Sequence, residues 1–237
     1  MSPDCLWTQH NEETLEAETM KIPVVRKILE ANEHTAGKNK DLFDRHRILA
    51  LNLMSSPGAG KTALLERTLS DLSPEMDMAV IEGDVQTTND AQRIAATGTP
   101  VVQINTDQAC HLDSSMIHEA LGRLDLHALD ILFIENVGNL VCPAAFDLGE
   151  DSKITLLSVP EGDDKPIKYP SMFLRSQLMI FNKLDLLPYL DFDLHQASQG
   201  ARSINPDIEI LAVSARTGEN LDTWYQWLRT RLKTKGK

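Results

Sequence analysis

The feature that most constrains this chain is a short glycine-containing segment between an apolar run and a helix-like stretch. Residues 55–62 read Ser-Ser-Pro-Gly-Ala-Gly-Lys-Thr, follow the apolar run 48–54 and precede the helix-like stretch 63–69. A strand, a glycine-rich turn ending in Gly-Lys-Thr and a helix are the context of a phosphate-binding loop. In such a loop, backbone N–H groups and the helix N-terminus favour an anion. The predicted phosphate-binding residues are Ser56, Pro57, Gly58, Ala59, Gly60, Lys61, Thr62 and Ala63.

Two side chains of this loop have distinct expected roles. Lys61 would reach the outer phosphates, and Thr62 would place its hydroxyl on Mg²⁺. One position departs from the pattern, because Ser55 stands where the first glycine is expected. We expect the loop to turn on Gly58 and Gly60 instead. The alternative is an ordinary surface turn between a strand and a helix.

A second segment indicates which base is bound. The apolar run 178–181 reads as a buried strand and leads into Asn182-Lys183-Leu184-Asp185. The Asp185 carboxylate can accept two N–H bonds from guanine, a pair that adenine does not offer, and a buried unpaired carboxylate is costly. The alternative for Asp185 is a helix N-cap or a solvated loop charge. A later strand end can give a backbone N–H to the base carbonyl, so the predicted guanine-binding residues are Asn182, Lys183, Asp185, Ser214, Ala215 and Arg216.

Composition narrows the classes of partner. The 237 residues carry 35 acidic against 23 basic side chains, for a formal net charge of −12. Without a broad basic face to neutralise phosphates, no nucleic-acid partner is expected. No apolar run approaches the roughly 20 residues that cross a bilayer, and the N-terminus lacks a signal-peptide pattern, so no membrane partner is expected. Three cysteines in such a chain suit a reducing, cytoplasmic setting with free thiols.

Short apolar runs alternate with helix-like segments from residue 47 onward. This alternation predicts an α/β fold: a three-layer P-loop NTPase with a mostly parallel sheet flanked by helices. We divide the chain into an N-terminal segment, 1–45, and a P-loop GTPase (G) domain, 46–237. Residues 1–20 are polar and acidic and are expected to be poorly ordered, with a helix after Pro23. The expected strands are 48–54, 78–81, 100–104, 131–134, 154–159, 178–181 and 208–213, and the expected helices are 61–72, 88–97, 113–123, 170–175, 195–203 and 221–234.

Loops at the carboxyl ends of parallel strands carry the ligands. Asp84 and Glu135 each follow an apolar run, where either acid can hold Mg²⁺ together with Thr62. Gly138, three residues after Glu135, would let its backbone N–H approach a γ-phosphate, as in a GTPase switch. The alternative for each acid is a strand-end cap. The predicted catalytic set is Lys61, Thr62, Asp84, Glu135 and Gly138.

Two cysteines and a histidine form a candidate metal site. Cys110-His111 comes after the run 100–104, and Cys142 comes four residues after Gly138. Both loops are expected at the same sheet edge, near the nucleotide. Two thiolates and an imidazole suit Ni²⁺ or Zn²⁺, and three ligands leave a coordination position open for water, a second chain or a client. The alternative is that both cysteines are small buried hydrophobes.

These motifs together resemble the HypB family of hydrogenase nickel-incorporation GTPases, in the SIMIBI class of P-loop NTPases. The resemblance runs in order over about residues 45–235. The segments that carry it are Ser55–Thr62, Glu82–Thr87, Cys110–Asp113, Glu135–Pro143, Glu161–Pro166, Asn182–Asp185 and Ser214–Gly218.

The resemblance implies a function, cofactors and partners. It implies GTP hydrolysis used to insert nickel into nickel–iron hydrogenase, with GTP/GDP and Mg²⁺ as cofactors and Ni²⁺ or Zn²⁺ on Cys110, His111 and Cys142. It also implies a homodimer favoured by nucleotide, with a second nickel maturation protein, HypA, and the hydrogenase large subunit as partners. Some members carry an N-terminal Cys-x-x-Cys-Gly-Cys motif or a histidine-rich run. This sequence has only Cys5 and His10 there, so no high-affinity N-terminal nickel site is expected.

Other functions remain open from the residues alone. UreG, the nickel-chaperone GTPase of urease maturation, is similar in the P-loop and base segments but has a Cys-Pro-His metal motif. A P-loop kinase of small molecules is disfavoured by the Asn-Lys-Leu-Asp segment and the missing lid-like arginine cluster. A scaffold that binds nucleotide without hydrolysing it is the non-enzymatic alternative.

A link between the two sites is also expected. Because Cys142 shares a loop with the switch segment 135–138, nucleotide state would set metal affinity. Intrinsic hydrolysis is expected to be slow, since Gln86 and Arg93 are only weak candidates for a water-orienting or arginine-finger residue.

Overall fold

The computed structural model describes residues 9–84, 88–107 and 109–236, with side chains from residue 27 onward. Gln86 and Cys5 lie outside the described residues, and the His10 side chain lies outside the described side chains. Within the described part of the chain, seven strands form one sheet in the order β3-β2-β4-β1-β5-β6-β7. The strands are β1 Leu49–Ser55, β2 Met78–Asp84, β3 Val101–Asn105, β4 Ile131–Glu135, β5 Ser152–Ser158, β6 Leu178–Asn182 and β7 Glu209–Ala212.

All neighbouring strands run parallel, which confirms the predicted α/β class. The seven expected apolar runs all became strands, because β-branched and other apolar residues suit a sheet that is covered on both faces. The register pairs Leu53 with Glu135 and Glu82 with Glu135, so the acidic ends of β2 and β4 lie next to the end of β1. The carboxyl edge at the centre of the sheet therefore gathers the P-loop and two acids.

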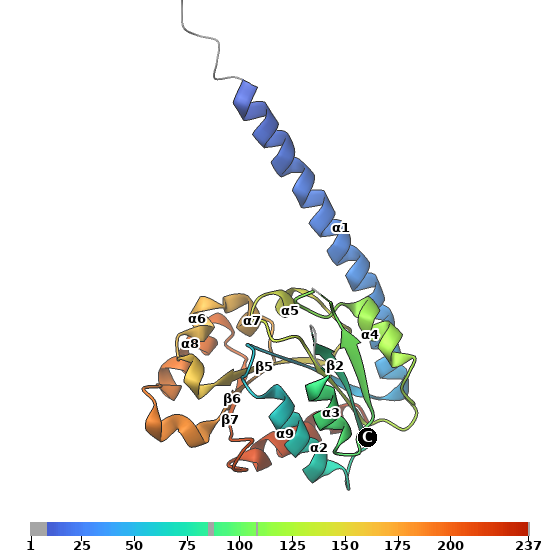
Figure 1. Cartoon of the computed structure of the whole chain (residues 1–237), viewed down its shortest axis with the longest axis vertical. Coiled ribbons are helices and arrows are strands. Elements are labelled where there is room, and N and C mark those ends of the chain that lie inside the picture. The colour runs from blue at the N-terminus through green and yellow to red at the C-terminus, as the bar shows by residue number, and fades with distance from the viewer. Residues whose placement is uncertain (1–8, 85–87, 108, 237) are drawn as a thin grey trace, which may run out of the picture.

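Helices cover both faces of the sheet and give three layers (Figure 1). One face packs its alternate residues, such as Leu51, Val80 and Phe133, against α2 and α9. The other face packs against α1 and α4 over the β2–β4 half and against α7 and α8 over the β5–β6 half. The helices are α1 Gln9–His46, α2 Lys61–Leu72, α3 Asn89–Ala95, α4 Ser114–Leu121, α5 Cys142–Ala145, α6 Lys165–Lys168, α7 Pro170–Leu174, α8 Leu194–Ile204 and α9 Leu221–Thr234.

Helix α1 differs from the sequence expectation. It begins at Gln9 and passes through Pro23, whereas residues 1–20 were expected to be poorly ordered. Glutamate, alanine, leucine and methionine dominate residues 12–20, and their high helix propensity accounts for the difference. Residues 1–8 lie outside the described chain, and the division at residue 45 stays a prediction.

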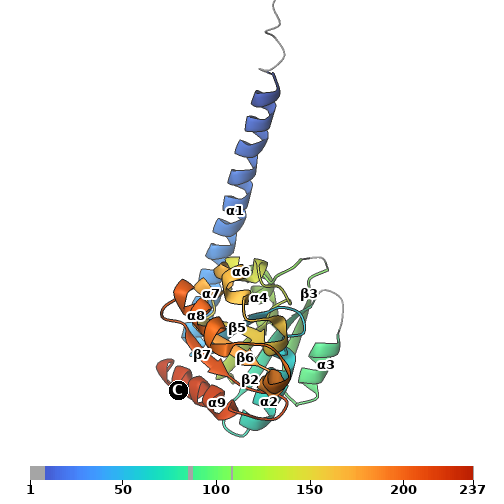
Figure 2. The ribbon, with the colours of Figure 1, turned by 90° about the vertical axis from the view of Figure 1, so that its left-hand side faces the viewer.

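The two ends of α1 have different surroundings. Its N-terminal part extends away from the rest of the molecule in both views (Figure 1, Figure 2). Its C-terminal part packs on the domain through Asn32, Ala36, Asn39 and Phe43, all buried and spaced at four, three and four residues. Only this end of α1 bears on the site described below.

Four short elements had no counterpart in the sequence prediction. They are α5, α6 and the 3₁₀ helices η1 Val159–Glu161 and η2 Leu184–Tyr189. Each contains a proline near its start or within it and is too short for a periodic pattern. Over the described residues, no helix combines the length and apolar character needed to cross a membrane.

Candidate nucleotide and metal sites

A cavity of about 480 Å³ lies at the carboxyl edge of the sheet, between the P-loop and the ends of β2 and β4. It brings together most of the predicted phosphate and catalytic residues. The lining residues are Pro57, Gly58, Gly60, Lys61, Thr62, Ala63, Glu82, Gly83, Asp84, Asp90, Arg93, Glu135, Asn136, Val137 and Gly138. Ser56 and Ala59 belong to the same loop: the Ser56 hydroxyl donates to Glu161, and Ala59 is buried.

Ser55, the departure from the P-loop pattern, contacts Lys61. Its hydroxyl accepts a hydrogen bond from Lys61 Nζ at 2.9 Å and donates to the Ser56 carbonyl at 2.7 Å. The left-handed turns fall on Gly58 and Gly60, with φ of 76° and 97°, as expected. A Cβ at Gly60 would lie 2.5 Å from Asn182 Nδ2, so glycine is required there. Serine is therefore compatible with the loop at position 55.

Two buried carboxyl groups face each other at the cavity wall. Glu82 and Glu135 are 2% and 4% exposed. Burial raises the pKa of Glu135 to about 7, against the opposing effects of the Lys61 charge and a hydrogen bond from Thr62. Burial, followed by the charge of Glu135, raises the pKa of Glu82 to about 8. Burial also lowers the pKa of Lys61, with Glu135 opposing.

The oxygen atoms around Thr62 fit a divalent cation. Thr62 Oγ1 donates to Glu135 Oε1 at 2.7 Å. Glu82 Oε2 and Glu135 Oε2 have no hydrogen-bond partner among the described residues. Buried carboxylate oxygens beside a hydroxyl are the hard donors that Mg²⁺ prefers, and a bound cation would compensate their burial. Asp84 lies half-buried on the same wall.

Gly138 brings the switch segment against the P-loop. A Cβ at this position would lie 2.9 Å from Pro57 Cα, so a larger residue would push the two loops apart. The close approach places Gly138 directly against Pro57 of the predicted phosphate-binding loop. The expected contact of the Gly138 N–H with a γ-phosphate stays a prediction.

The base segments lie beside the P-loop and are linked to each other. Lys183 has φ of 64°, and its Nζ donates to the Gly58 carbonyl at 2.6 Å. Asn182 Nδ2 donates to the Ala59 carbonyl at 3.0 Å, and Asn182 Oδ1 accepts from Ala215 N at 3.1 Å. Ser214 donates to Asp185 Oδ1 at 2.6 Å. The predicted base residues therefore form one connected set, with Arg216 exposed at its edge.

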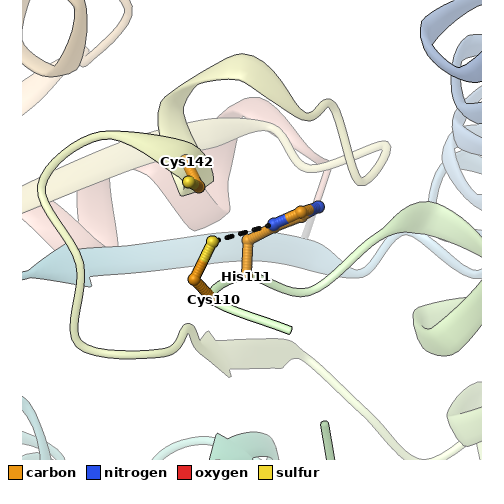
Figure 3. A group of neighbouring side chains, drawn as sticks. All are labelled: Cys110, His111 and Cys142. Atoms are coloured by element: carbon orange, nitrogen blue, oxygen red, sulfur yellow. Dashed lines mark hydrogen bonds between the residues drawn. The ribbon is translucent and has the colours of Figure 1, made fainter. Parts of the chain in front are cut away.

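The two cysteines and the histidine also come together (Figure 3). The ligand atoms of Cys110, His111 and Cys142 all lie within 4.8 Å of one another, and Cys110 Sγ is 3.7 Å from His111 Nδ1. Cys142 begins α5, whereas the other two lie between β3 and α4. The His111 ring stacks on Phe146 with a centroid distance of 3.8 Å. The arrangement is open, because Cys110 is exposed.

The local environment affects the protonation of these candidate ligands. Burial lowers the pKa of His111, which favours the neutral imidazole that binds metals. A hydrogen bond with the Cys110 thiol, together with burial, raises the pKa of Cys142. Metal binding by Cys142 must therefore release a proton. Asn139 joins the two loops, since its Nδ2 donates to the Cys110 carbonyl at 3.3 Å and its Oδ1 accepts from Val141 N.

Several residues of the cavity were not predicted as site residues. Glu82 was overlooked because the sequence pattern ended its strand at residue 81, whereas β2 continues to Asp84. Asn136 lies between two predicted residues without an expected role of its own. Arg93 lines the cavity but forms ion pairs with Glu66 and Asp90.

The parallel sheet, the loop after β1 and the cavity above it define a P-loop nucleotide-binding protein. A family profile described as "CobW/HypB/UreG, nucleotide-binding domain" matches residues 49–212. Hydrogenase maturation factor HypB of Escherichia coli (strain K12) is 55% identical over 204 residues, which cover 86% of this chain and 70% of that protein. HypB of Azotobacter vinelandii is 52% identical over 219 residues, covering 92% and 72%.

Solved structures agree with the sequence relatives. The crystal structure of HypB from Helicobacter pylori in complex with nickel has a TM-score of 0.83 at 38% identity, covering 86% of this chain and 96% of that one. HypB from Archaeoglobus fulgidus has a TM-score of 0.81 at 36% identity. The chain therefore belongs to the CobW/HypB/UreG family and, within it, to the HypB hydrogenase maturation factors. This confirms the resemblance seen in the motifs and disfavours the UreG and kinase alternatives.

Proposed function

We propose that this protein is a GTP-hydrolysing metallochaperone that binds nickel and helps insert it into nickel–iron hydrogenase. One observation carries the proposal: residues 135–142 run from the phosphate cavity at Glu135 to the cysteine–histidine cluster at Cys142. The related HypB from Helicobacter pylori was crystallised in complex with nickel, which supports nickel as the metal. Zn²⁺ is the alternative cargo, because the donor set accepts either ion.

The nucleotide site would act through positioned charges. Lys61 and the P-loop N–H groups would bind the phosphates, while Asp185 would select guanine. Thr62, Glu135 and Asp84 would hold Mg²⁺, which supplies charge neutralisation between the phosphates when bound. Glu135 would also orient the attacking water, and the Gly138 N–H would contact the γ-phosphate. Glu82 adds a further buried carboxylate to this wall.

The expected homodimer has a candidate surface. Four large apolar side chains are exposed on α6, α7 and the end of η2: Ile167 60%, Leu174 60%, Tyr189 81% and Leu190 42%. A backbone hydrogen bond from Asp193 to the Asp163 carboxylate holds the segment after η2 near the segment before α6. Exposed large apolar groups on neighbouring segments favour protein contacts. HypA and the hydrogenase large subunit are the proposed partners, and the cytoplasm is the proposed location.

The proposal is tested by nucleotide and metal binding on the full chain. We expect GTP and GDP to bind much more tightly than ATP, slow phosphate release from GTP, and Ni²⁺ binding that Cys142→Ala abolishes. His195→Ala, an exposed histidine of α8, is the matched control and should leave Ni²⁺ binding unchanged. Equal ATP and GTP affinities would contradict the base assignment. Unchanged Ni²⁺ binding in Cys142→Ala would contradict the metal site, and bound GTP that stays intact for hours would favour a scaffold.

A further inference from the structure

Asn136 lies between the two sites and is almost fully buried, at 1% exposure. It follows the cavity residue Glu135 and precedes Val137 and Gly138 in the switch segment. Its side chain reaches the backbone of the other candidate metal-site loop. The amide oxygen accepts from Leu112 N at 3.1 Å, and Leu112 directly follows His111.

The hydrogen bonds of this amide fix its orientation. Oδ1 also accepts from Val137 N at 3.0 Å, and Nδ2 donates to Asn52 Oδ1 at 3.2 Å. Two backbone N–H groups therefore use both lone pairs of Oδ1. If the amide were flipped, its NH₂ group would face these two N–H donors and could accept no hydrogen bond from them. Leaving a buried amide without such partners lowers the stability of the fold by about 1–3 kcal/mol. A shift of the switch segment must therefore either move Leu112 or break this hydrogen bond.

A second chain of contacts starts from the same residue and reaches the other side of His111. Asn52 Nδ2 donates to Glu150 Oε1 at 3.0 Å, and Glu150 forms a buried ion pair with Lys153. Lys153 Nζ in turn donates to the Phe146 carbonyl at 2.8 Å. The Phe146 ring stacks on His111. Asn136 is thus connected to His111 through the backbone on one side and through a stacked ring on the other.

We propose that Asn136 is the positioning residue through which the nucleotide-dependent switch segment moves His111 within the metal site. This rests on the proposed function, because it needs both ligands to bind. Displacement of the 136–138 segment by a γ-phosphate shifts the Leu112 N–H that Asn136 holds, and the imidazole moves with the backbone. Metal ligand distances are tight to about 0.2 Å, so a small shift changes metal affinity.

The test compares Ni²⁺ affinity in two nucleotide states, with Mg·GDP or a non-hydrolysable GTP analogue, using the full chain. In the wild type we expect the two affinities to differ by roughly fivefold or more. In Asn136→Ala we expect their ratio to fall to about one while Ni²⁺ still binds. Asn205→Ala is the matched control: it also removes asparagine hydrogen bonds to backbone carbonyls, those of Phe173 and Ser176, but these lie outside both sites, so it should keep the ratio.

The outcomes separate this proposal from the proposed function. Loss of Ni²⁺ or GTP binding in the wild type contradicts both. If the wild type has equal Ni²⁺ affinities in the two nucleotide states, the sites are not coupled and this proposal alone is overturned. The same holds if Asn136→Ala keeps the wild-type ratio of Ni²⁺ affinities. Should that variant fail to fold, amide hydrogen exchange of Leu112 in the wild type decides: protection that differs between the two nucleotide states supports the role of Asn136, and equal protection overturns it.

Discussion

At the scale of single residues, the most consequential feature is the buried pair Glu82 and Glu135. Ionising both of these buried carboxyl groups has a large free-energy cost unless a cation compensates their charge. The P-loop Lys61 supplies one positive charge, and a divalent cation bound at Thr62 would supply the rest. Because burial raises the pKa of both groups, we expect the nucleotide-free protein to hold a proton at this site near neutral pH and to release it when the site is loaded.

We predict that Glu82→Gln stabilises the nucleotide-free protein at pH 8 by about 2 kcal/mol or more. The pKa of Glu82 rises from 4.5 to about 8 on folding, so the folded state retains a proton that the unfolded state loses above pH 4.5. Stability from this group is complete below pH 4.5 and is lost as pH rises through 8. Urea unfolding without divalent ions at pH 5 and pH 8 measures this slope.

Glutamine stays neutral, so the variant should show a flatter decline between the two pH values. Glu33→Gln changes an exposed glutamate of α1 and serves as the control, with the wild-type slope expected. An identical pH dependence in Glu82→Gln and the wild type would contradict the burial of an ionisable pair at this wall.

Individual residues also show what the sequence could predict. The P-loop glycines, Lys61 and Thr62 follow a spacing that determines backbone shape, so their positions were predictable. The role of Ser55 in holding Lys61 was not, because it depends on where a lysine side chain turns inside a folded loop. Glu82 was missed because the apolar pattern ended its strand at residue 81, so its pairing with Glu135 on the neighbouring strand was not foreseen.

At the scale of elements, the C-terminal part of α1 is hydrogen-bonded to the segments that flank the candidate metal site. Asn39 Nδ2 donates to the carbonyls of Ser114 and Leu148, at 2.8 Å and 3.1 Å. Asn32 Oδ1 accepts from Ser114 N, and its Nδ2 donates to the Asp147 carbonyl. Ser114 comes three residues after His111, and residues 147–148 directly follow Phe146. The C-terminal part of α1 thus braces both loops.

We predict that Asn39→Ala destabilises the protein by about 1–3 kcal/mol, because it leaves two buried carbonyls without their donor. It should also weaken Ni²⁺ binding in every nucleotide state, since both loops lose their brace. Lys38→Ala, which alters an exposed neighbour on the same helix, should change neither quantity by more than about 0.5 kcal/mol. Equal unfolding free energies of Asn39→Ala and the wild type would refute the bracing role.

Elements differed in how well the sequence predicted them. Strands and the longer helices of the G domain were predictable because their apolar spacing reflects the two covered faces of the sheet. The N-terminal part of α1 was not, since its pattern is polar and only helix propensity favours it. The closeness of Cys110 and Cys142 followed from topology, because both loops leave the carboxyl edge, but Phe146 stacking on His111 did not.

At the scale of the whole molecule, the exposed apolar residues on α6, α7 and at the end of η2 predict a surface for self-association. We predict that the wild type forms a dimer that GTP analogues favour, and that Tyr189→Asp weakens this dimer at least about tenfold by placing a charge in an apolar contact. Sedimentation equilibrium with and without nucleotide measures it. Glu219→Lys, a charge change at an exposed loop position, is the control. A dimer that is insensitive to Tyr189→Asp would place the interface elsewhere.

Coupling between the two sites requires energetic linkage between the phosphate cavity and the cysteine–histidine cluster. The most direct measurement is the affinity of the full chain for GDP and for a GTP analogue, with and without saturating Ni²⁺. Linkage is reciprocal, so Ni²⁺ should change the ratio of the two nucleotide affinities by the factor with which nucleotide changes Ni²⁺ affinity. A nucleotide affinity ratio that Ni²⁺ leaves unchanged would contradict this coupling.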